Sequence, residues 1–430
     1  MRPAVVGLGA VSAAGVGVDA LTATLREGTS RITAAPWGPD GPPFGAALPP
    51  LTMEGALAAR GALPAALLER AHRALRRAPL PLQVAAGAAL EAWEHARLHD
   101  APLAAERIAL VVAGSNLTGG YVEAQRAVFA SNPGHLSPRF ALHSLDTDHV
   151  GTLSEILGIR GEGFTVGGAS ASGNLAIIQA SRLLALGEAD ACVVVGALPD
   201  LSRIELQGLV NIGAMAHRLP DAPGRLPPPP FDHDRRGFVL GQASACLILE
   251  TAGSARRRQV PALAHLLGHA AVLDGSRLAA PSIGGEQAAM TQALARAELA
   301  PAQLGYVSAH GSGSELGDSI ELAALRAALG DSFSRVWINS TKALTGHCLG
   351  AAGVLEAVAT VLQLQGGFIH AMPGLAHPID VTFRFPRGAA ARERVEFALS
   401  NSFGFGGISS SIVLAQPRAL DAATTRSVTP

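Results

Sequence analysis

Short apolar segments that end in glycine or serine alternate along this chain with longer stretches rich in alanine and leucine. Four such segments stand at residues 108–114, 191–196, 306–311 and 336–340. Alternation of this kind is typical of α/β proteins, in which helices cover a sheet. Because the apolar runs are continuous, we expect these strands to be buried on both faces.

One pattern occurs twice. Gly173-Asn174-Leu175 opens a nearly all-apolar stretch that ends at Gly187, and Gly353-Val354-Leu355 opens a similar stretch that ends at Gly367, an offset of 180 residues at both ends. A helix that is apolar on nearly every face must be buried. The repeat indicates a duplicated βα architecture with two central helices. Chance similarity between two helices rich in alanine and leucine is the alternative.

Composition and charge narrow the range of partners. The 33 basic and 34 acidic residues give a net charge of −1, which argues against a nucleic-acid binder. With 48% apolar and 16% charged residues, the chain should fold over most of its length. Its three cysteines do not suit a disulfide framework. The N-terminal residues lack a signal-peptide pattern, and about 18 apolar residues nowhere run without glycine, proline or charge, so we expect a cytoplasmic protein without a membrane span.

A turn of small residues precedes the first of the two apolar helices. Residues 165–173 read TVGGASASG, and Ser170 lies where the strand gives way to the helix. The unpaired N–H groups and positive dipole end of a helix suit a nucleophile or an oxyanion. The alternative is that the small residues only allow the strand and the helix to approach closely.

Two histidines lie beside glycines at the ends of expected strands. His310 belongs to AHGSGS (309–314), and His347 ends NSTKALTGH (339–347). A single histidine at a strand end is usually structural. Ligand sites of α/β sheets lie beyond the carboxyl ends of the strands, so two such histidines favour a shared site. Asp318 and Glu321 follow the first segment, and Glu356 lies in the helix after the second.

Other patterns are weaker. The turn NSFGFGG (401–407) carries two of the few aromatic residues, and tight packing alone would explain it. The segment GLGAVS (7–12) has Ser12 where a dinucleotide motif needs its third glycine, so a dinucleotide site is not expected. His310 and His347 lack neighbouring ligands in metal-binding spacing, so a metal site is not expected either.

Together these segments resemble the β-ketoacyl synthase family, the condensing enzymes of fatty-acid and polyketide assembly. The resemblance begins at VVGLGAVS (5–12), includes FDHDRRGFVLG (231–241) and closes with NSFGFGG (401–407). It implies the thiolase fold, with duplicated βα halves in a five-layered αβαβα arrangement. The halves should span 1–250, with the active-site turn, and 251–415, with the two histidines. We expect residues 416–430 to form a flexible tail.

By this resemblance, His310 and His347 match the active-site histidines, and Lys342 and Glu356 match a supporting Lys–Glu pair. Phe405 matches a gating phenylalanine whose backbone N–H helps to form the oxyanion hole. The chain departs from the family at Ser170, where condensing members carry the nucleophilic cysteine. None of Cys192, Cys246 and Cys348 stands there, and each is expected to be a small buried residue.

The substitution at position 170 changes the expected chemistry. A cysteine at a helix N-terminus ionises near neutral pH and attacks thioesters, whereas a serine needs an adjacent general base. Decarboxylation of a malonyl thioester needs only donors that stabilise the enolate, and two histidines can supply them. The sequence resembles the Ser-containing decarboxylating ketosynthase-like proteins of polyketide β-branching, which implies conversion of malonyl- to acetyl-acyl carrier protein.

The same resemblance implies the partners. The substrate would arrive on the phosphopantetheine arm of an acyl carrier protein, without any other cofactor, and the product would supply an HMG-synthase-like protein. The enzyme would be a homodimer. Carrier proteins are acidic, so a basic docking patch is expected. The candidates are Arg70, Arg73, Arg76 and Arg77 on one helix, with Arg218 as a second position.

Three other functions remain open from the sequence. A non-catalytic subunit like a chain-length factor also lacks the cysteine, but it has no need of the two histidines. Ser170, activated by a histidine, could act in an acyltransferase or a starter-loading synthase. A serine hydrolase is the third, because Ser170, Asp318 and His347 occur in the hydrolase order, although the final glycine of the nucleophile elbow is missing.

Overall fold

Two five-stranded units with the same strand order make up the main sheet. The computed structural model describes residues 2–37, 41–216 and 226–419. The first unit has the order β6-β5-β7-β9-β1, with β5 parallel to β6 and β7, and β9 antiparallel to β7 and β1. Its strands are β1 (Ala4–Ser12), β5 (Ile108–Ala113), β6 (Gly163–Val166), β7 (Ala191–Gly196) and β9 (Ala243–Glu250).

The second unit repeats this arrangement. Its order is β12-β11-β15-β16-β10, with β11 parallel to β12 and β15, and β16 antiparallel to β15 and β10. Within each unit the strands follow the order third, second, fourth, fifth, first, so the predicted duplication is confirmed. The strands are β10 (Ala264–Leu273), β11 (Tyr306–Ser308), β12 (Trp337–Asn339), β15 (Phe397–Gly404) and β16 (Ile408–Ala415).

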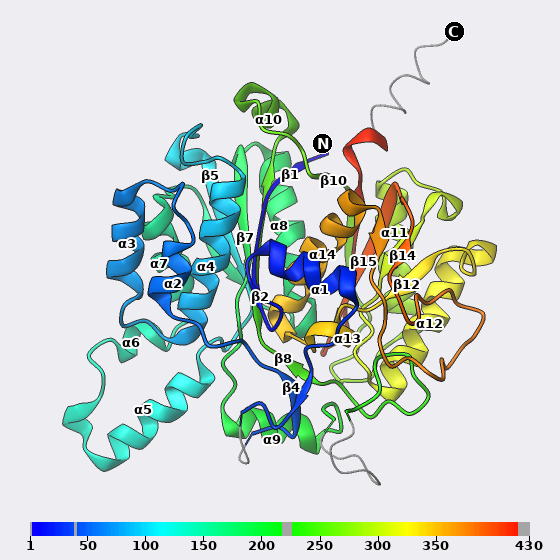
Figure 1. Ribbon diagram of the computed structural model, residues 1–430, viewed down its shortest axis with the longest axis horizontal. Helices are drawn as coiled ribbons and strands as arrows, with labels where there is room; N and C mark the ends of the chain where they lie inside the picture. The colour runs from blue at the N-terminus through cyan, green and yellow to red at the C-terminus, as the bar shows by residue number, and fades with distance from the viewer. Residues whose placement is uncertain (1, 38–40, 217–225, 420–430) are drawn as a thin grey trace.

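Helices complete a five-layered αβαβα arrangement, as expected of the thiolase fold. The units join edge to edge through β1 and β10. Figure 1 shows α3, α4 and α7 outside the first unit, α8 and α14 in the centre, and α11 and α12 outside the second. These helices are α3 (Ala65–Leu75), α4 (Leu80–His95), α7 (Thr147–Leu157), α8 (Ser172–Leu186), α11 (Ile283–Arg296), α12 (Glu315–Leu329) and α14 (Ala352–Gly366).

Shorter elements occupy the connections. The helices are α1 (Val18–Glu27), α2 (Met53–Ala58), α5 (Gly119–Ser131), α6 (Phe140–His143), α9 (Arg203–Asn211), α10 (Ala252–Arg258) and α13 (Lys342–Thr345). The strands are β2 (Gly15–Val16), β3 (Thr33–Ala34), β4 (Phe44–Ala46), β8 (Leu240–Gly241), β13 (Phe368–Ile369) and β14 (Ala391–Arg392).

The early glycines of the chain serve strand–helix packing. A Cβ atom on Gly7 would lie 2.4 Å from the Ala92 carbonyl oxygen, and one on Gly9 would lie 2.0 Å from that of Ala88. Both carbonyls belong to α4, so these glycines let β1 and α4 approach closely. The spacing that resembles part of a dinucleotide motif therefore has a structural explanation.

The two central helices are built alike. Short 3₁₀ turns, η3 (Ala169–Ala171) and η6 (Leu349–Ala351), lead into α8 and α14. Gly187 and Gly367 end the helices in the left-handed conformation, as the sequence pattern indicated. Among the described residues, the window Leu349–Gly366 is long and apolar enough to cross a membrane, but 78% of it is buried inside the protein.

The described part of the expected tail is held by hydrogen bonds. Gln416 N–H donates to the Glu396 carbonyl at 2.9 Å, and its side chain donates to the Leu364 carbonyl. Residues 420–430 and Arg218 lie outside the described residues.

Candidate active site

Ser170 lies in the η3 turn between β6 and α8. Its neighbour Ala169 has φ 48°, a left-handed conformation that non-glycine residues rarely adopt. Ser172 fixes the turn, because its Oγ donates to the Ala169 carbonyl at 2.7 Å and accepts from the Gly168 N–H at 2.9 Å. The strained turn presents the Ser170 side chain to a cavity.

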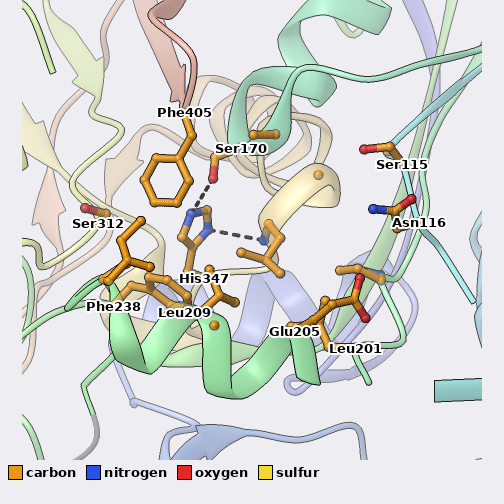
Figure 2. A pocket seen from close by; sticks show the side chains of 18 of the residues that line it. Ser115, Asn116, Ser170, Leu201, Glu205, Leu209, Phe238, Ser312, His347 and Phe405 are labelled. Carbon is orange, nitrogen blue, oxygen red and sulfur yellow. Dashed lines mark hydrogen bonds between the residues drawn. The ribbon is translucent and has the colours of Figure 1, made fainter. Parts of the chain in front are cut away.

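His347 contacts Ser170 through a defined nitrogen. Its Nε2 lies 2.9 Å from Ser170 Oγ, and its Nδ1 accepts from the Leu349 N–H at 3.2 Å (Figure 2). An imidazole nitrogen that accepts a hydrogen bond carries no proton, so the neutral ring must be protonated at Nε2. Burial, together with the Lys342 charge, holds the pKa of His347 well below its usual range, so the ring is neutral at pH 7. His347 therefore donates to Ser170 and does not act as its base.

His310 lies next to His347 at the same cavity. The two rings are 5.5 Å apart and nearly perpendicular. Glu321 anchors the segment, because its carboxylate accepts from the backbone N–H groups of His310 and Gly311 at 2.8 and 2.7 Å. Burial lowers the pKa of His310 well below its usual range, and the charge of Lys342 adds to this effect. His310 Nδ1 is buried without a partner among the described residues.

Lys342 and Glu356 form a buried ion pair behind the histidines. Lys342 Nζ lies 2.5 Å from both Glu356 Oε1 and the His310 carbonyl oxygen. Burial raises the pKa of Glu356 to about 7, and Lys342 opposes that rise. Neither residue lines the cavity, and the contact of Lys342 with the His310 segment is to the backbone carbonyl.

The cavity of about 440 Å³ brings Ser170, His310, His347 and Phe405 together. In Figure 2, the Phe405 ring lies beside the Ser170–His347 pair, and Leu209 and Phe238 lie on the opposite side of the histidine. No lysine or arginine is among the described residues that line it, and its one carboxylate is that of Glu205. The cavity is therefore largely apolar, with donor groups at one end.

Phe405 is half-exposed, and it follows directly on β15. The end of this strand touches the Ser170 turn, since a Cβ atom on Gly404 would lie 2.3 Å from the Gly168 carbonyl oxygen. The end of the strand that precedes Phe405 is therefore packed against the turn that carries Ser170.

Several lining residues were not predicted from the sequence. Phe238 packs edge-on against His347 at 5.2 Å, and Phe403 lies 5.7 Å from His310. Helix α9 contributes Glu205, Gly208 and Leu209, although none of its residues is buried. The segment 231–241 and the turn 401–407 were noticed as motifs. Helix α9 begins with a capping box of Ser202 and Glu205, a pattern that predicts a helix start but not a cavity wall.

The arginines predicted for docking divide into two groups. Arg70 donates twice to the Ile156 carbonyl, at 3.1 and 3.3 Å, and so ties α3 to α7. Arg73, Arg76 and Arg77 are exposed on or just after α3. These three remain available to a partner.

The serine-hydrolase interpretation does not fit this geometry. A Ser-His-Asp triad needs a carboxylate on the far nitrogen of the histidine. In His347 that nitrogen accepts from Leu349, and Asp318 instead accepts from the N–H groups of Phe231 and Gly313. Among the described residues, no three His, Cys, Asp or Glu side chains are grouped so as to hold a metal ion.

Two protein-family models match most of the chain. The profile "Beta-ketoacyl synthase, N-terminal domain" matches residues 1–255, and "Beta-ketoacyl synthase, C-terminal domain" matches residues 263–376.

Individual relatives agree with these matches. The chain is 39% identical over 341 residues to the polyketide biosynthesis malonyl-ACP decarboxylase PksF of Bacillus subtilis (strain 168), covering 79% of this chain and 81% of that protein. It is 36% identical over 309 residues to the 3-oxoacyl-[acyl-carrier-protein] synthase 2 of Rhizobium meliloti (strain 1021), covering 71% and 73%. A β-ketoacyl synthase structure from Burkholderia phymatum STM815 aligns with a TM-score of 0.81 at 25% identity, covering 96% of this chain and 99% of that one.

Proposed function

The chain belongs to the β-ketoacyl synthase family, and we propose that it converts malonyl-acyl carrier protein to acetyl-acyl carrier protein by decarboxylation. The observation that carries this proposal is the pairing at position 170, where a serine accepts a hydrogen bond from a histidine that cannot activate it. The site keeps its donors and lacks a nucleophile. The name of the relative PksF gives independent support.

The two histidines supply the chemistry that decarboxylation needs. The bond between the carboxylate carbon and the α-carbon breaks, CO₂ leaves, and the electron pair moves into the thioester to form an enolate. The Nε2–H of His310 would donate to the enolate oxygen, and the Nε2–H of His347 would exchange its bond to Ser170 Oγ for one to the same oxygen. Preorganised donors at such an oxygen are worth about 10²–10³ in rate each.

No thiol replaces the missing cysteine. Cys192, Cys246 and Cys348 are all buried. Burial raises the pKa of the Cys348 thiol to about 12 and also holds the pKa values of the Cys192 and Cys246 thiols well above the usual range. None of them can form the thiolate that accepts an acyl group. A covalent acyl-enzyme on cysteine is therefore not part of this mechanism.

The lack of a cationic side chain in the described cavity lining favours loss of CO₂. A malonyl carboxylate that leaves water for an apolar cavity without a cationic partner is destabilised more than the diffuse charge of the transition state. The described lining residues offer no lysine or arginine to it. The cavity thus disfavours the ground state, while the histidines stabilise the product of bond cleavage.

We assign the delivery of substrate to an acyl carrier protein, whose phosphopantetheine arm would enter the cavity and whose acidic surface would meet Arg73, Arg76 and Arg77. We include Arg218 as a second contact. Arg70 would support this surface indirectly, because its hydrogen bond to the Ile156 carbonyl ties α3 to α7. No other cofactor is required by this chemistry.

We propose a homodimer, formed at the free edge of the first unit. β6 is the edge strand there, and its residues are half-buried or exposed. Nearby, α5 has no buried residue, and Phe129, Leu142 and Leu145 are each more than half exposed. A second copy that covers this surface would remove the edge strand and the apolar side chains from water.

We also propose a place for the reaction. The acetyl group on its carrier would serve an HMG-synthase-like enzyme in polyketide β-branching, in the cytoplasm, where the three free thiols would stay reduced.

The two halves, 1–250 and 251–415, would act as one catalytic unit, because the Ser170 turn comes from the first and both histidines from the second.

Mass spectrometry of the intact enzyme with malonyl-acyl carrier protein tests the proposal. We expect acetyl-acyl carrier protein and CO₂ with no change in enzyme mass. A stable acyl adduct would support the acyltransferase or starter-loading alternative, which the 2.9 Å contact of Ser170 with His347 suggests. If neither product nor adduct formed, the chain would be a non-catalytic subunit.

A further inference from the structure

Decarboxylation consumes a proton, and the residues described so far do not identify its source. The enolate left by CO₂ becomes an acetyl group only when its α-carbon gains a proton. His310 and His347 are neutral and donate to the oxygen, so a proton that either histidine gave up would have to be replaced. This inference rests on the proposed function and concerns that replacement.

A second, smaller cavity adjoins the first. It has a volume of about 80 Å³ and shares His310, Phe403 and Phe405 with the larger cavity. Its other walls carry four carboxyl groups, those of Asp274, Glu286, Asp318 and Glu321. A polar space of this size has room for water. His310 therefore borders the same space as a set of acids that the substrate cavity does not contain.

Glu286 is the acid in this set that lacks donors. It lies in the first turn of α11, is 2% exposed, and its Oε2 has no hydrogen-bond partner among the described residues. Glu321, in contrast, accepts from the His310 N–H, the Gly311 N–H and the Asn401 side chain. Three donors favour the ionised form of a carboxyl group, and a buried carboxyl without donors favours the neutral form.

The surrounding charges point the same way. Burial raises the pKa of Glu286 to about 10, and Glu321, Asp318 and Asp274 add to the rise in that order. Burial also raises the pKa of Glu321, to about 7, against the donors from Gly311, His310 and Asn401. The N-terminus of α11 favours an anion, but this effect is smaller than that of burial beside three carboxyl groups.

We propose that Glu286 is a neutral carboxylic acid and that it supplies, through water in the smaller cavity, the proton that His310 passes to the enolate. His310 receives a proton at Nδ1, which is buried without a partner, and gives the Nε2 proton to the α-carbon. This leaves Glu286 as a carboxylate and His310 with its proton on Nδ1. Before the next cycle His310 takes a proton from solvent at Nε2 and returns its Nδ1 proton to Glu286 through the same water. The net uptake is one proton for each CO₂ released.

Kinetics in H₂O and D₂O test this relay. We expect Glu286→Gln to lower kcat by about 10²-fold with KM unchanged, and to increase the solvent isotope effect, because protonation of the enolate becomes slow. Glu286→Asp should recover part of kcat. Glu250→Gln is the matched control, since Glu250 is buried with an unpartnered Oε1 but lines neither cavity.

A readout independent of activity accompanies the kinetics. At pH 8.5, above the pKa of about 7 that burial gives Glu321 and Glu356, infrared spectra should still contain a carboxylic-acid C=O band that Glu286→Gln removes and Glu250→Gln retains. The pKa of Glu286 is raised on folding, so its contribution to stability is complete below the unfolded pKa and is lost as the pH rises toward 10. The Tm of Glu286→Gln minus that of the wild type should therefore grow between pH 5 and 8.

The outcomes separate the two proposals. Wild-type values of kcat and isotope effect in Glu286→Gln would overturn the relay and leave decarboxylation standing, as would absence of the acid band from the wild type. A wild type that releases no CO₂ from malonyl-acyl carrier protein would overturn the proposed function and the relay together.

Discussion

Gly173 and Gly353 face each other where α8 and α14 cross. A Cβ atom on Gly173 would lie 2.7 Å from the Gly353 Cα and 2.5 Å from the Val354 nitrogen, and both of these are backbone atoms. The two positions are related by the internal repeat, so each central helix offers the other its smallest residue. The active-site turns η3 and η6 directly precede this crossing.

This contact predicts a large effect of one methyl group. Gly173→Ala should destabilise the protein by about 1–3 kcal/mol, because the clash is with backbone and cannot be relieved by a side-chain rotation. Gly151→Ala, in α7, has no atom within 4 Å of the new Cβ and should be neutral or stabilising. Denaturant unfolding measures both. Equal stability of the two variants would contradict the crossing.

The different roles of the two histidines and Ser170 predict unequal losses of decarboxylase activity. His310→Ala and His347→Ala should each reduce CO₂ release by about 10²–10³-fold, because each removes a donor to the enolate. Ser170→Ala should retain a substantial part of the rate, since the serine accepts a bond from His347 and does not attack the substrate. Rates of acetyl-acyl carrier protein formation distinguish the variants. A Ser170→Ala enzyme as inactive as the histidine variants, with an acylated wild type, would make the serine a nucleophile.

Restoring a cysteine should restore a reactive thiol. Ser170→Cys places the sulfur just before the N-terminus of α8, which favours the thiolate. Iodoacetamide at neutral pH should therefore label one residue in this variant and none in the wild type, whose three thiols are buried. Peptide mass mapping locates the label. Labelling of the wild type at the same rate would contradict the burial of those cysteines.

The exposed arginines of α3 predict a salt-dependent docking effect. Reversing Arg73 and Arg76 to glutamate should raise KM for malonyl-acyl carrier protein by about 10-fold at low salt, because charge complementarity is lost. A small malonyl thioester should be unaffected. The control reverses Arg256 and Arg257, two exposed arginines at the end of α10. Equal losses on the carrier-bound and small substrates would exclude docking at α3.

The histidines predict an unusual pH profile. Burial lowers the pKa values of His310 and His347 well below 6.5, so both rings stay neutral as the pH falls from 7 to 6. The imidazole NMR resonances of both histidines, assigned by their loss in His310→Ala and His347→Ala, should not titrate near pH 6.5. A titration centred on that value would mean that a histidine behaves as it does in water.

Much of the fold could be predicted because its signals are local. The apolar helices and their terminal glycines, Gly187 and Gly367, are visible in the sequence, and so is the turn that carries Ser170. The protonated nitrogen of His347 was not predictable, because it depends on the φ of Leu349 and the N–H that this conformation directs to Nδ1.

Other features depend on contacts between distant segments. Glu286 and Glu321 belong to different helices, and only the packing of α11 beside α12 brings both to the wall of one cavity. By helical spacing, Arg70 lies on the same face as Arg73 and Arg76, yet its side chain is hydrogen-bonded to the Ile156 carbonyl. Sequence spacing predicts which face of a helix a residue lies on, but not whether a carbonyl of a distant segment lies beside it.

The second strained turn, η6, bears on the number of active sites in each chain. Leu349 repeats the backbone conformation of Ala169, with φ 49° against 48°, and Gly350 therefore occupies the position that corresponds to Ser170. A Cβ atom on Gly350 would lie 3.0 Å from the Gly114 Cα, a tight contact, and glycine itself has no functional group to present. The pseudo-twofold symmetry of the scaffold is thus broken at the one place where it would have given two reaction centres. Each chain therefore has one active site. Titration with a tight-binding inhibitor should reach its end point at one inhibitor molecule per chain.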